Sequence, residues 1–529
     1  MRLFSMRSGR ALVRLVVVGA AFTAAMLVVG CGNSYRPVVT PIGNSGPAAE
    51  ATSYAVVVSA PSNSTGIATI IDWSGDSILA YAPVGPGPLS FTLDELGSEG
   101  YTVNRDGTLT NFPITTSLQA KSVTYSTLSS TANVVNMMTP SSGMWATDLT
   151  GSYVDLFTGS PESYKLSIPA ATTPVMVAGS PTLQGQREYV VAQNFSDPTG
   201  LACNTTPTAM GNGVVVPVEI SSYTPDTPIN VGVCPVWAVQ SNDQRRLFVV
   251  NRGDDTITVV NTVNNALDCN GDPTGKACVP FQSQVGAWIT GHPTIKLPAG
   301  SGPVSAEYNS AKQQLVVANY TGGTISVIDV PVDEYGNDAN TYATSNCVPD
   351  GITCVSINGA TYLITSGFGT IHTIKVGNTT NPYPASVTVL YDGSRAYTAN
   401  QGDDSGTGNG TVSVVNLTSY QVEKTLAVVG HPRTVVSTQN STIAKIYAAA
   451  PDSPYLTIIK DSGTASDSID TAILVEGNIV DVRVTTQNGD SGNTLYSSRT
   501  PGYGQPCSLP PGSAGLPSPL TLAGCRQIP

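Results

Sequence analysis

The stretch "LFVVNRGDDTITVVNT" at residues 247–262 decides the fold, because close relatives of it recur along the chain. Two apolar runs flank a polar turn that is rich in Asp and Gly, which is the pattern of a β-hairpin. Clear copies are "QLVVANYTGGTISVIDV" from Gln314 and "RAYTANQGDDSGTGNGTVSVVNL" from Arg395. Repetition of this kind indicates a body assembled from similar β units.

Two more strands complete each unit. After several copies a third strand ends at a Gly-x-Pro or Gly-x-x-Pro turn, as in "TIKLPAGSGP" from Thr294 and "VEKTLAVVGHP" from Val422, and a further apolar strand follows. Four strands per repeat are typical of propeller blades. We expect full units near 84–121, 122–173, 174–234, 235–302, 303–383, 384–431 and 432–478.

The strands left over at the two ends predict how the ring closes. "IVDVRVTT" at 479–486 has no partners of its own, and the N-terminal strands within 54–84 are one strand short of a unit. Together they complete one blade, which removes the exposed edges of an open ring. The sequence therefore predicts an all-β propeller of eight four-stranded blades. Merging the two weakest units, 84–173, would give the alternative of seven.

The repeated phrase also resembles a known family. The strands "LFVVN" and "AYTAN", followed by Gly or Asp, by "TISVID" or "TVSVVN" and by "VGHP", resemble the Tyr-Val-Thr-Asn repeat family of β-propellers, which occurs in bacterial and archaeal surface proteins. The resemblance is clear over 235–460 and fainter over 54–234. Asn251, Asn319 and Asn400 stand at the last position of the tetrad. The resemblance implies the fold and no activity, because this family has no shared catalytic motif.

Composition agrees with an all-β protein. Only 11% of the 529 residues are charged, against about 25% in an average soluble domain. The 52 Gly and 38 Pro disfavour long helices and favour short strands joined by turns. In the hairpin turns Gly253 and Gly322 tolerate positive φ, and Asp254 or Asp403 can hydrogen-bond the turn backbone. A net charge of −12 makes nucleic acid an unfavourable partner.

The N-terminus predicts export and a lipid anchor. Four Arg precede an apolar run at 15–29, which fits a secretion signal and is shorter than the roughly 20 residues that cross a bilayer. "VVGC" at 28–31 resembles the lipobox of bacterial lipoproteins, and this resemblance implies acylation of Cys31. We expect a signal peptide at 1–30, a flexible tether at 31–52, the propeller at 53–500 and a Pro/Gly-rich strap at 501–529. The expected location is the cell membrane or outer membrane, facing the periplasm or the exterior.

The nine Cys fit this location. Lipidation of Cys31 would account for the odd one, and the other eight fall into neighbouring pairs that an oxidising compartment could join as disulfides. Proximity alone suggests this pairing, since eight Cys allow 105 connectivities. The candidate pairs are Cys203 with Cys234, Cys269 with Cys278, Cys347 with Cys354, and Cys507 with Cys525.

Metal binding and catalysis find little support in the sequence. Asp268, Asn270 and Asp272 are spaced like the first ligands of a calcium loop, but Pro273 and Val279 replace its Gly and bidentate Glu, so calcium is a weak expectation and no other cofactor is predicted. The sequence contains three His: His292 and His431 in Gly-His-Pro turns, and His372 in a strand. No hydrolase or phosphate-loop motif occurs, and Glu307 is the lone acid expected on an innermost strand.

Long insertions are the features that point to a function. Segments near 263–291 and 331–370 interrupt units between their third and fourth strands, and segments near 194–213 and 401–410 lengthen the loop between strands two and three. The two classes of loop emerge on opposite faces of a propeller. Long loops are often functional, although surface loops also tolerate added length. We therefore expect a binding or assembly platform for a protein or glycan of the cell envelope. The alternative is a lactonase- or lyase-like propeller enzyme that uses the central channel.

Overall fold

The structure is a computed structural model, and its regular elements are all strands. It describes residues 53–61, 65–94, 97–114, 123–128, 134–138, 143–149, 151–159, 162–179, 187–196, 203, 210–241, 246–262, 265–268, 294–330, 341–343, 354–357, 360–364, 369–402, 409–462 and 467–485. Among these residues there is no helix long and apolar enough to cross a bilayer. All of them belong to one compact unit that begins at Ala51.

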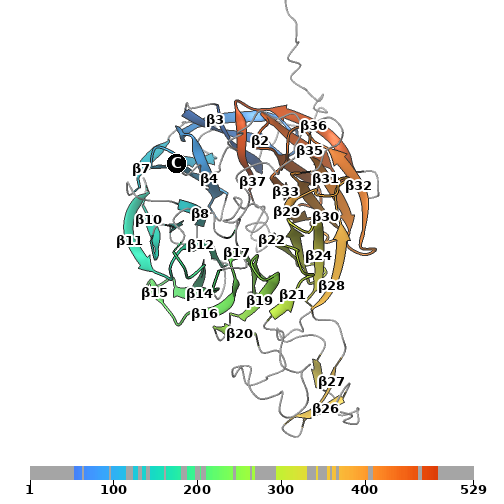
Figure 1. The fold of residues 1–529 in the computed structure, drawn as a ribbon. Coiled ribbons are helices and arrows are strands. Elements are labelled where there is room, and N and C mark those ends of the chain that lie inside the picture. Colours follow the sequence, from blue (N-terminus) through green and yellow to red (C-terminus); the bar gives the residue numbers. More distant parts are fainter. Residues whose placement is uncertain are drawn as a thin grey trace, which may run out of the picture. The chain divides into compact units, whose positions relative to one another are not determined.

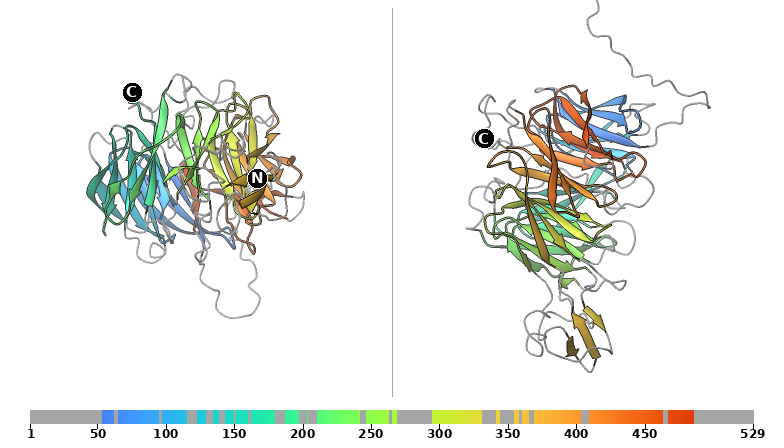
Figure 2. Two further views of the ribbon diagram at one scale, coloured as in Figure 1. Left: turned by 90° about the horizontal axis from the view of Figure 1, so that it is seen from below. Right: turned by 90° about the vertical axis from the view of Figure 1, so that its right-hand side faces the viewer.

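The unit is an eight-bladed β-propeller whose antiparallel sheets are arranged around a centre (Figures 1 and 2). Blades 1 and 2 contain β4 (Pro88–Leu93), β5 (Glu99–Asn104), β6 (Thr108–Pro113) and β7 (Thr124–Thr127), then β8 (Val134–Met138), β9 (Met144–Asp148), β10 (Tyr153–Thr158) and β11 (Ser163–Pro169). In blades 3 and 4 the outer strand is in two pieces. Blade 3 contains β12 (Pro174–Ala178), β13 (Arg187–Ala192), β14 (Asn212–Glu219), β15 (Thr224–Pro225) and β16 (Ile229–Val233). Blade 4 contains β17 (Pro235–Gln240), β18 (Arg246–Asn251), β19 (Thr256–Asn261), β20 (Ala266–Leu267) and β21 (Thr294–Lys296).

The other four blades follow the same plan. Blade 5 contains β22 (Pro303–Asn309), β23 (Gln314–Asn319), β24 (Thr324–Asp329) and β28 (Thr370–Lys375). Blade 6 contains β29 (Pro384–Val389), β30 (Arg395–Asn400), β31 (Thr411–Asn416) and β32 (Gln421–Ala427). Blade 7 contains β33 (Thr434–Ser437), β34 (Lys445–Ala449), β35 (Tyr455–Lys460) and β36 (Ser468–Leu474). The closing blade contains β1 (Tyr54–Ala60), β2 (Thr65–Asp72), β3 (Ile78–Pro86) and β37 (Asn478–Val484). The prediction of eight blades is confirmed, and the alternative of seven is wrong.

Ring closure is confirmed as well. The C-terminal strand β37 is innermost in the closing blade and pairs antiparallel with β1, with Val57 opposite Val482. The backbone amide of Tyr54 donates to Thr485 Oγ1 at 2.7 Å, across 431 residues of sequence. On the outer side, Lys445 Nζ of blade 7 donates to Asp76 Oδ2 at 2.6 Å and to Trp73 O at 2.8 Å in the closing blade. Both termini of the ring are thus fixed by backbone and side-chain bonds.

A shared backbone conformation begins five of the blades. The residue before the innermost strand has a left-handed φ of 48° to 56°, and a Pro follows it as the first strand residue. Pro suits the first position of a strand because it has no amide hydrogen to leave unpaired there. The repeated x-Pro turns of the sequence are therefore the connectors between blades. The five residues are Gly87, Thr173, Cys234, Gly302 and Tyr383.

The repeated Asn is a structural residue. Asn400 ends the second strand of blade 6, and its Nδ2 donates to Thr411 Oγ1 at 3.0 Å and to Ser413 Oγ at 2.8 Å on the third strand. Ser413 Oγ in turn accepts the amide of Gly377, in the connector from blade 5, at 2.9 Å. This network holds the hairpin together and ties it to the blade before it. Asn104, Asn251 and Asn319 make the same pair of bonds in blades 1, 4 and 5.

The acceptor side of this network is complete in some blades and incomplete in others. Thr398 Oγ1, two residues before Asn400, donates to Asn400 Oδ1 at 2.9 Å. In blade 5, Val317 stands at the matching position, and Asn319 Oδ1 is buried without a hydrogen-bond partner among the described residues. An unpaired buried carbonyl oxygen of this kind costs about 1–3 kcal/mol.

Val317→Thr is therefore expected to be tolerated better than other buried Val→Thr changes. The new hydroxyl would donate to Asn319 Oδ1, so this variant should lose about 1 kcal/mol less unfolding free energy than Val316→Thr. Val316 is the matched control, because it is equally buried on the same strand and faces the other side of the sheet. Urea unfolding of both variants measures the difference, and equal losses would contradict this account.

The space between blades is filled as the alternating pattern predicts. The apolar residues expected there are all buried: Val249, Val259, Val317, Ile325, Ile328, Val412 and Val414. The turns do not use the positive φ that Gly253 and Gly322 tolerate, since Asp255 and Gly323 adopt the left-handed conformation instead. The turn places its left-handed residue last, next to the third strand. A unit boundary also moves: β7 ends at Thr127, beyond the expected 121, because "TYST" carries no apolar alternation.

Candidate functional site

Hydrogen bonds join the innermost strands of neighbouring blades. In several blades a side chain on the innermost strand accepts a backbone amide from the next innermost strand. Glu307 Oε1 on β22 accepts the amide of Val389 on β29 at 3.1 Å, and Ser386 Oγ on β29 accepts the amide of Val435 on β33 at 3.0 Å. Asn136 does the same for Val177, at 3.2 Å. These bonds occupy the strand edges that line the centre of the ring.

The acids of the innermost strands are committed to this framework. Glu307 is 1% exposed, and its Oε1 also accepts from Gln439 Nε2 at 3.2 Å, so one carboxylate joins blades 5, 6 and 7. Glu307 is not the lone acid expected, because Asp481 lies on β37 and is fully buried. Asp481 Oδ2 accepts from Arg483 Nε at 3.2 Å. Burial raises the pKa of Asp481, and the positive charges of Arg483 and Arg433 oppose this shift.

The charged pair on β37 could have been noticed in the sequence. "IVDVRV" places Asp481 and Arg483 two residues apart in an apolar strand, hence on one face. Arg433, just before β33, extends this cluster toward blade 7, where its Nη2 donates to Val480 O at 2.9 Å. The cluster therefore links blade 7 to the closing blade.

The two His residues that the structure describes are also held by contacts within the fold. His431 Nδ1 lies 2.7 Å from Asp452 Oδ2, its backbone amide donates to Asp452 Oδ1 at 2.8 Å, and both side chains are buried. Although burial opposes it, hydrogen bonding to His431 lowers the pKa of Asp452. His372 lies on the outer strand β28, stacked 3.7 Å from the ring of Tyr420. His292 lies outside the described residues.

Asp268, the first residue of the calcium-loop candidate, forms a buried ion pair. Asp268 is 1% exposed, and its Oδ2 accepts from Arg246 Nε at 3.1 Å. Asn270 and Asp272 lie outside the described residues. Within the described ranges, no three His, Cys, Asp or Glu side chains form a group that could hold a metal ion. Asp268 therefore has a structural role whatever the rest of its loop does.

One pair of carboxylates shares a single proton donor. Tyr101 OH lies 2.9 Å from Glu99 Oε2 in blade 1 and 3.4 Å from Glu162 Oε1 in blade 2. Burial, reinforced by the negative charge of Glu99, raises the pKa of Glu162 to about 7. No sequence motif marks this cluster, because the two Glu are 63 positions apart and the blades bring them together.

The stability of the protein is expected to depend on Glu162 between pH 5 and 8. Because its pKa is raised from 4.5 to about 7 in the folded state, Glu162 takes up a proton on folding in this window. Its contribution is complete below the unfolded pKa and is lost as the pH rises through about 7. The unfolding free energy of wild type relative to Glu162→Gln should thus fall from pH 5 to pH 8. A flat difference would show that Glu162 is ionised throughout.

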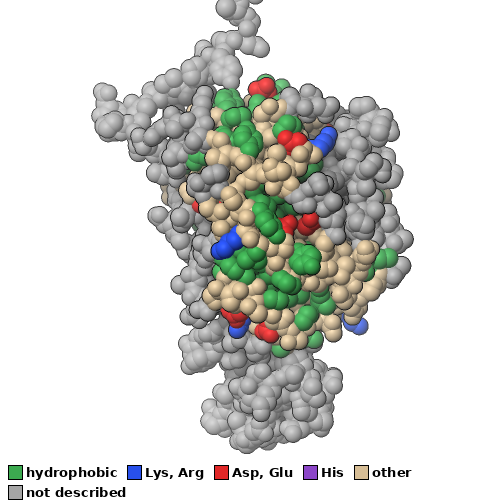
Figure 3. Space-filling model, turned by 90° about the vertical axis from the view of Figure 1, so that its left-hand side faces the viewer, with side chains coloured by type: hydrophobic (Ala, Val, Ile, Leu, Met, Phe, Trp, Pro, Cys, Tyr) green, Lys and Arg blue, Asp and Glu red, His purple; other side chains and the backbone are tan. Residues whose placement is uncertain are grey.

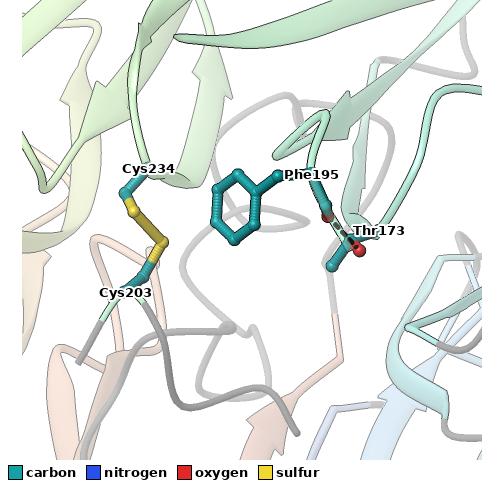
Figure 4. Close-up of a disulfide and its surroundings, with 4 residues drawn as sticks. All are labelled: Thr173, Phe195, Cys203 and Cys234. Carbon is teal, nitrogen blue, oxygen red and sulfur yellow. Dashed lines mark hydrogen bonds between the residues drawn. A yellow bond between two sulfur atoms is a disulfide. The ribbon is translucent and has the colours of Figure 1, made fainter. Parts of the chain in front are cut away.

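A disulfide fixes the insertion between β13 and β14. Cys203 is joined to Cys234, with Cα atoms 5.7 Å apart, and both residues are fully buried (Figure 4). Cys234 belongs to the connector that leads into blade 4, and on the other side of the same insertion Thr173 Oγ1 donates to Phe195 O at 2.7 Å. The insertion is thus tied to the connectors on both sides of blade 3. Cys31, Cys269, Cys278, Cys347, Cys507 and Cys525 lie outside the described residues, and of Cys354 only its place in the strand β26 is described.

Removing this disulfide should weaken the propeller without unfolding it. The bond closes a loop with a sequence separation of 31, for which loop entropy predicts a stabilisation of about 4 kcal/mol. Chemical denaturation of the Cys203→Ser/Cys234→Ser variant should show this loss of unfolding free energy. Added reductant should lower the unfolding free energy of the wild type toward that of the variant. Stability equal to the wild type would mean that the bond carries no constraint.

The chain resembles several propellers of known structure. Dihydro-heme d1 dehydrogenase NirN is 14% identical, with a TM-score of 0.53 and coverage of 88% of this chain and 80% of that one. A 6-phosphogluconolactonase-like protein from Bacteroides fragilis is 13% identical, with a TM-score of 0.47 and coverage of 83% and 99%. Apo AztD from Citrobacter koseri is 11% identical, with a TM-score of 0.48 and coverage of 82% and 97%. At these identities the similarity shows the fold alone.

No protein-family model matches the sequence, and no curated protein matches it.

Proposed function

We propose that this chain is a lipid-anchored, extracytoplasmic propeller of Tyr-Val-Thr-Asn repeats that acts as a binding or assembly platform at the cell envelope. One observation carries the proposal. The insertion between β24 and β28 builds a sheet of its own, from β25 (Thr341–Ala343), β26 (Cys354–Ile357) and β27 (Ala360–Ile364). An insertion that contains strands of its own is a module added to the blade, and long loops are often functional.

The chemistry of the ring agrees with a platform. Glu307, Asp481, His431 and Asp268 could each serve a catalyst by residue type, but each is engaged in a buried hydrogen bond or ion pair. A general acid or base must lie within hydrogen-bond reach of its substrate, and the burial of these groups within the ring opposes such contact. A propeller that binds partners through the loops on its faces needs no catalytic acid or base.

The junction of β24 and β28 allows a clean test. Asp329 pairs with Thr370, so a two-residue Asn-Gly turn can replace residues 331–368 without moving either strand. The matched control replaces residues 403–408, between the paired strands β30 and β31, by the same turn. After cross-linking in the cell envelope, we expect specific partners to be lost from the first variant and kept in the second. Identical partner sets, or lactone turnover by the purified wild type, would overturn the platform.

The lipid anchor has its own test. Cys31→Ser should move the protein from the membrane fraction to the soluble fraction and abolish incorporation of a labelled fatty acid. Cys507→Ser is the control, because it changes a Cys outside the lipobox-like stretch. Membrane retention and labelling of the Cys31→Ser variant would refute the anchor while leaving the platform open.

A further inference from the structure

Among the described residues, the outermost strand of blade 1 is shorter than that of blade 2. The outermost strand of blade 1, β7, has 4 residues, whereas β11 of blade 2 has 7. Where the blades meet, Ser126 Oγ on β7 donates to Glu162 O, just before β11. Nearer the core, Phe157 of β10 packs with Tyr101 and Leu109 of blade 1. Beyond that contact, Tyr153 and Tyr164 are 49% and 55% exposed.

These tyrosines share one face of the hairpin β10–β11. Side chains alternate along a strand, so Tyr153 and Asp155 lie on the same side as Phe157. The register places Ser167 opposite Asp155 and the bulged Tyr164 opposite Phe157. The Tyr164 and Ser167 hydroxyls lie 2.8 Å apart, and Ser167 Oγ donates to Asp155 Oδ1 at 2.6 Å. The Tyr164 ring also meets Phe157 edge-on, with ring centroids 5.9 Å apart. Tyr164 is thus held at both its ring and its hydroxyl.

The face offers aromatic rings and hydrogen-bonding groups with little charge. Asp155 has one oxygen occupied by Ser167, and burial raises its pKa. Lys165 is turned to the other side of the hairpin, where its Nζ lies 5.2 Å from the ring centroid of Tyr223. Figure 3, which views the side of the ring that carries β7, β10 and β11, shows mainly apolar and uncharged polar groups, with Asp/Glu and Lys/Arg groups scattered among them.

We propose that this surface, formed by Tyr153, Asp155, Tyr164 and Ser167, docks a neutral oligosaccharide. Aromatic rings offer an apolar face to the C–H groups of a sugar, and hydroxyl and carboxylate oxygens accept its hydroxyls. From Tyr153 to the level of Tyr164 is four residues of strand, about 13 Å, so the two rings suit a chain of sugars better than a single one.

The charge of this surface and the arrangement of its side chains disfavour two other kinds of ligand, anionic polymers and proteins. An anionic polymer would meet Asp155 and a net charge of −12. Protein interfaces usually have a contiguous apolar core, whereas a polar Asp–Ser pair separates these two rings. This inference rests on the proposed platform and names one class of its partners.

The experiment probes the full chain on an array of neutral oligosaccharides and anionic polysaccharides. We expect binding to neutral chains that falls at least about tenfold in Tyr153→Ala/Tyr164→Ala and is kept in Tyr153→Phe/Tyr164→Phe, which retains the rings. Tyr391→Ala/Tyr455→Ala is the matched control, because these tyrosines are similarly exposed, at 37% and 38%, on other blades. Thermal unfolding checks that each variant is folded.

Failure of this inference can be told from failure of the platform. Absence of neutral binding in the wild type, equal binding by the alanine variant, or preference for anionic chains would overturn the glycan surface. If the partners that depend on residues 331–368 are still captured by Tyr153→Ala/Tyr164→Ala, the platform stands without it. If glycan binding needs both tyrosines while no partner depends on residues 331–368, the glycan surface formed by Tyr153, Asp155, Tyr164 and Ser167 stands, and the insertion has another role.

Discussion

A chain that ends after Gly477 is expected to fail to form a stable propeller. The truncation removes β37, which supplies the innermost strand of the closing blade and pairs with β1. Four of its apolar side chains, Ile479, Val480, Val482 and Val484, are at most 2% exposed. At about 1.5–3 kcal/mol each, their burial amounts to roughly 6–12 kcal/mol, as much as the whole stability of a typical domain.

The loss should be visible in several measurements. We expect no cooperative thermal transition, rapid proteolysis and association of chains through the open edge of β1. A chain that ends after Thr485 is the control, because it keeps every strand that the structure describes. A cooperative transition at the same temperature in both chains would contradict closure by β37.

Arg395→Met is expected to lower the unfolding free energy by about 4 kcal/mol. Arg395 Nε lies 2.8 Å from Glu423 Oε2 and its Nη1 lies 2.9 Å from Asp461 Oδ1, while Asp467 Oδ2 is within 3.9 Å of Nε. One guanidinium thus faces three carboxylates of blades 6 and 7, and its side chain is 8% exposed. Removing one member of a buried ion pair costs about 3–5 kcal/mol, because the remaining charges stay buried.

Arg187→Met is the matched control for this variant. Arg187 also pairs with a Glu across two strands, at 2.5 Å from Glu219, but its side chain is 36% exposed. An exposed pair contributes at most about 1 kcal/mol. Urea unfolding at pH 7 should separate the two variants clearly, and equal losses would mean that the Arg395 cluster is solvated.

Acid should reduce the effect of Arg395→Met. Burial opposes the shift, but hydrogen bonds from Asn416 and Arg395 and the charge of Arg395 lower the pKa of Glu423 in the folded state. A lowered pKa gives stability that is present above the unfolded pKa and is lost as the pH falls through the folded one. The wild type should lose this contribution on acidification, so the difference between wild type and variant should shrink below about pH 4.5.

Most of the fold could be predicted because strands and turns follow from short-range pattern. Alternating apolar residues, Asp/Gly turns and x-Pro connectors each depend on residues within a few positions of one another, so they can be read from one stretch at a time. The errors lie where that pattern is weak. The strand "TYST" at Thr124–Thr127 has no apolar alternation, and the left-handed residue of a turn depends on its hydrogen bonds.

The candidate site was far less predictable, because the role of a polar residue depends on partners from other blades. Glu307 could be picked out as an acid on an innermost strand, but its bond to Gln439 spans 132 residues. Tyr101 and Glu162 meet across 61 residues. No local spacing encodes such pairs.

The sequence by itself determined the four-stranded repeat, the number of blades and the sharing of one blade by the two ends, since each is a consequence of periodicity and of the need to pair strand edges. Only the tertiary structure decided which acids are engaged in holding blades together, and that Tyr153 and Tyr164 are exposed on one face of a hairpin. The physical reason is that burial and pairing are properties of neighbours in space, which the circular packing of the blades brings together from distant parts of the chain.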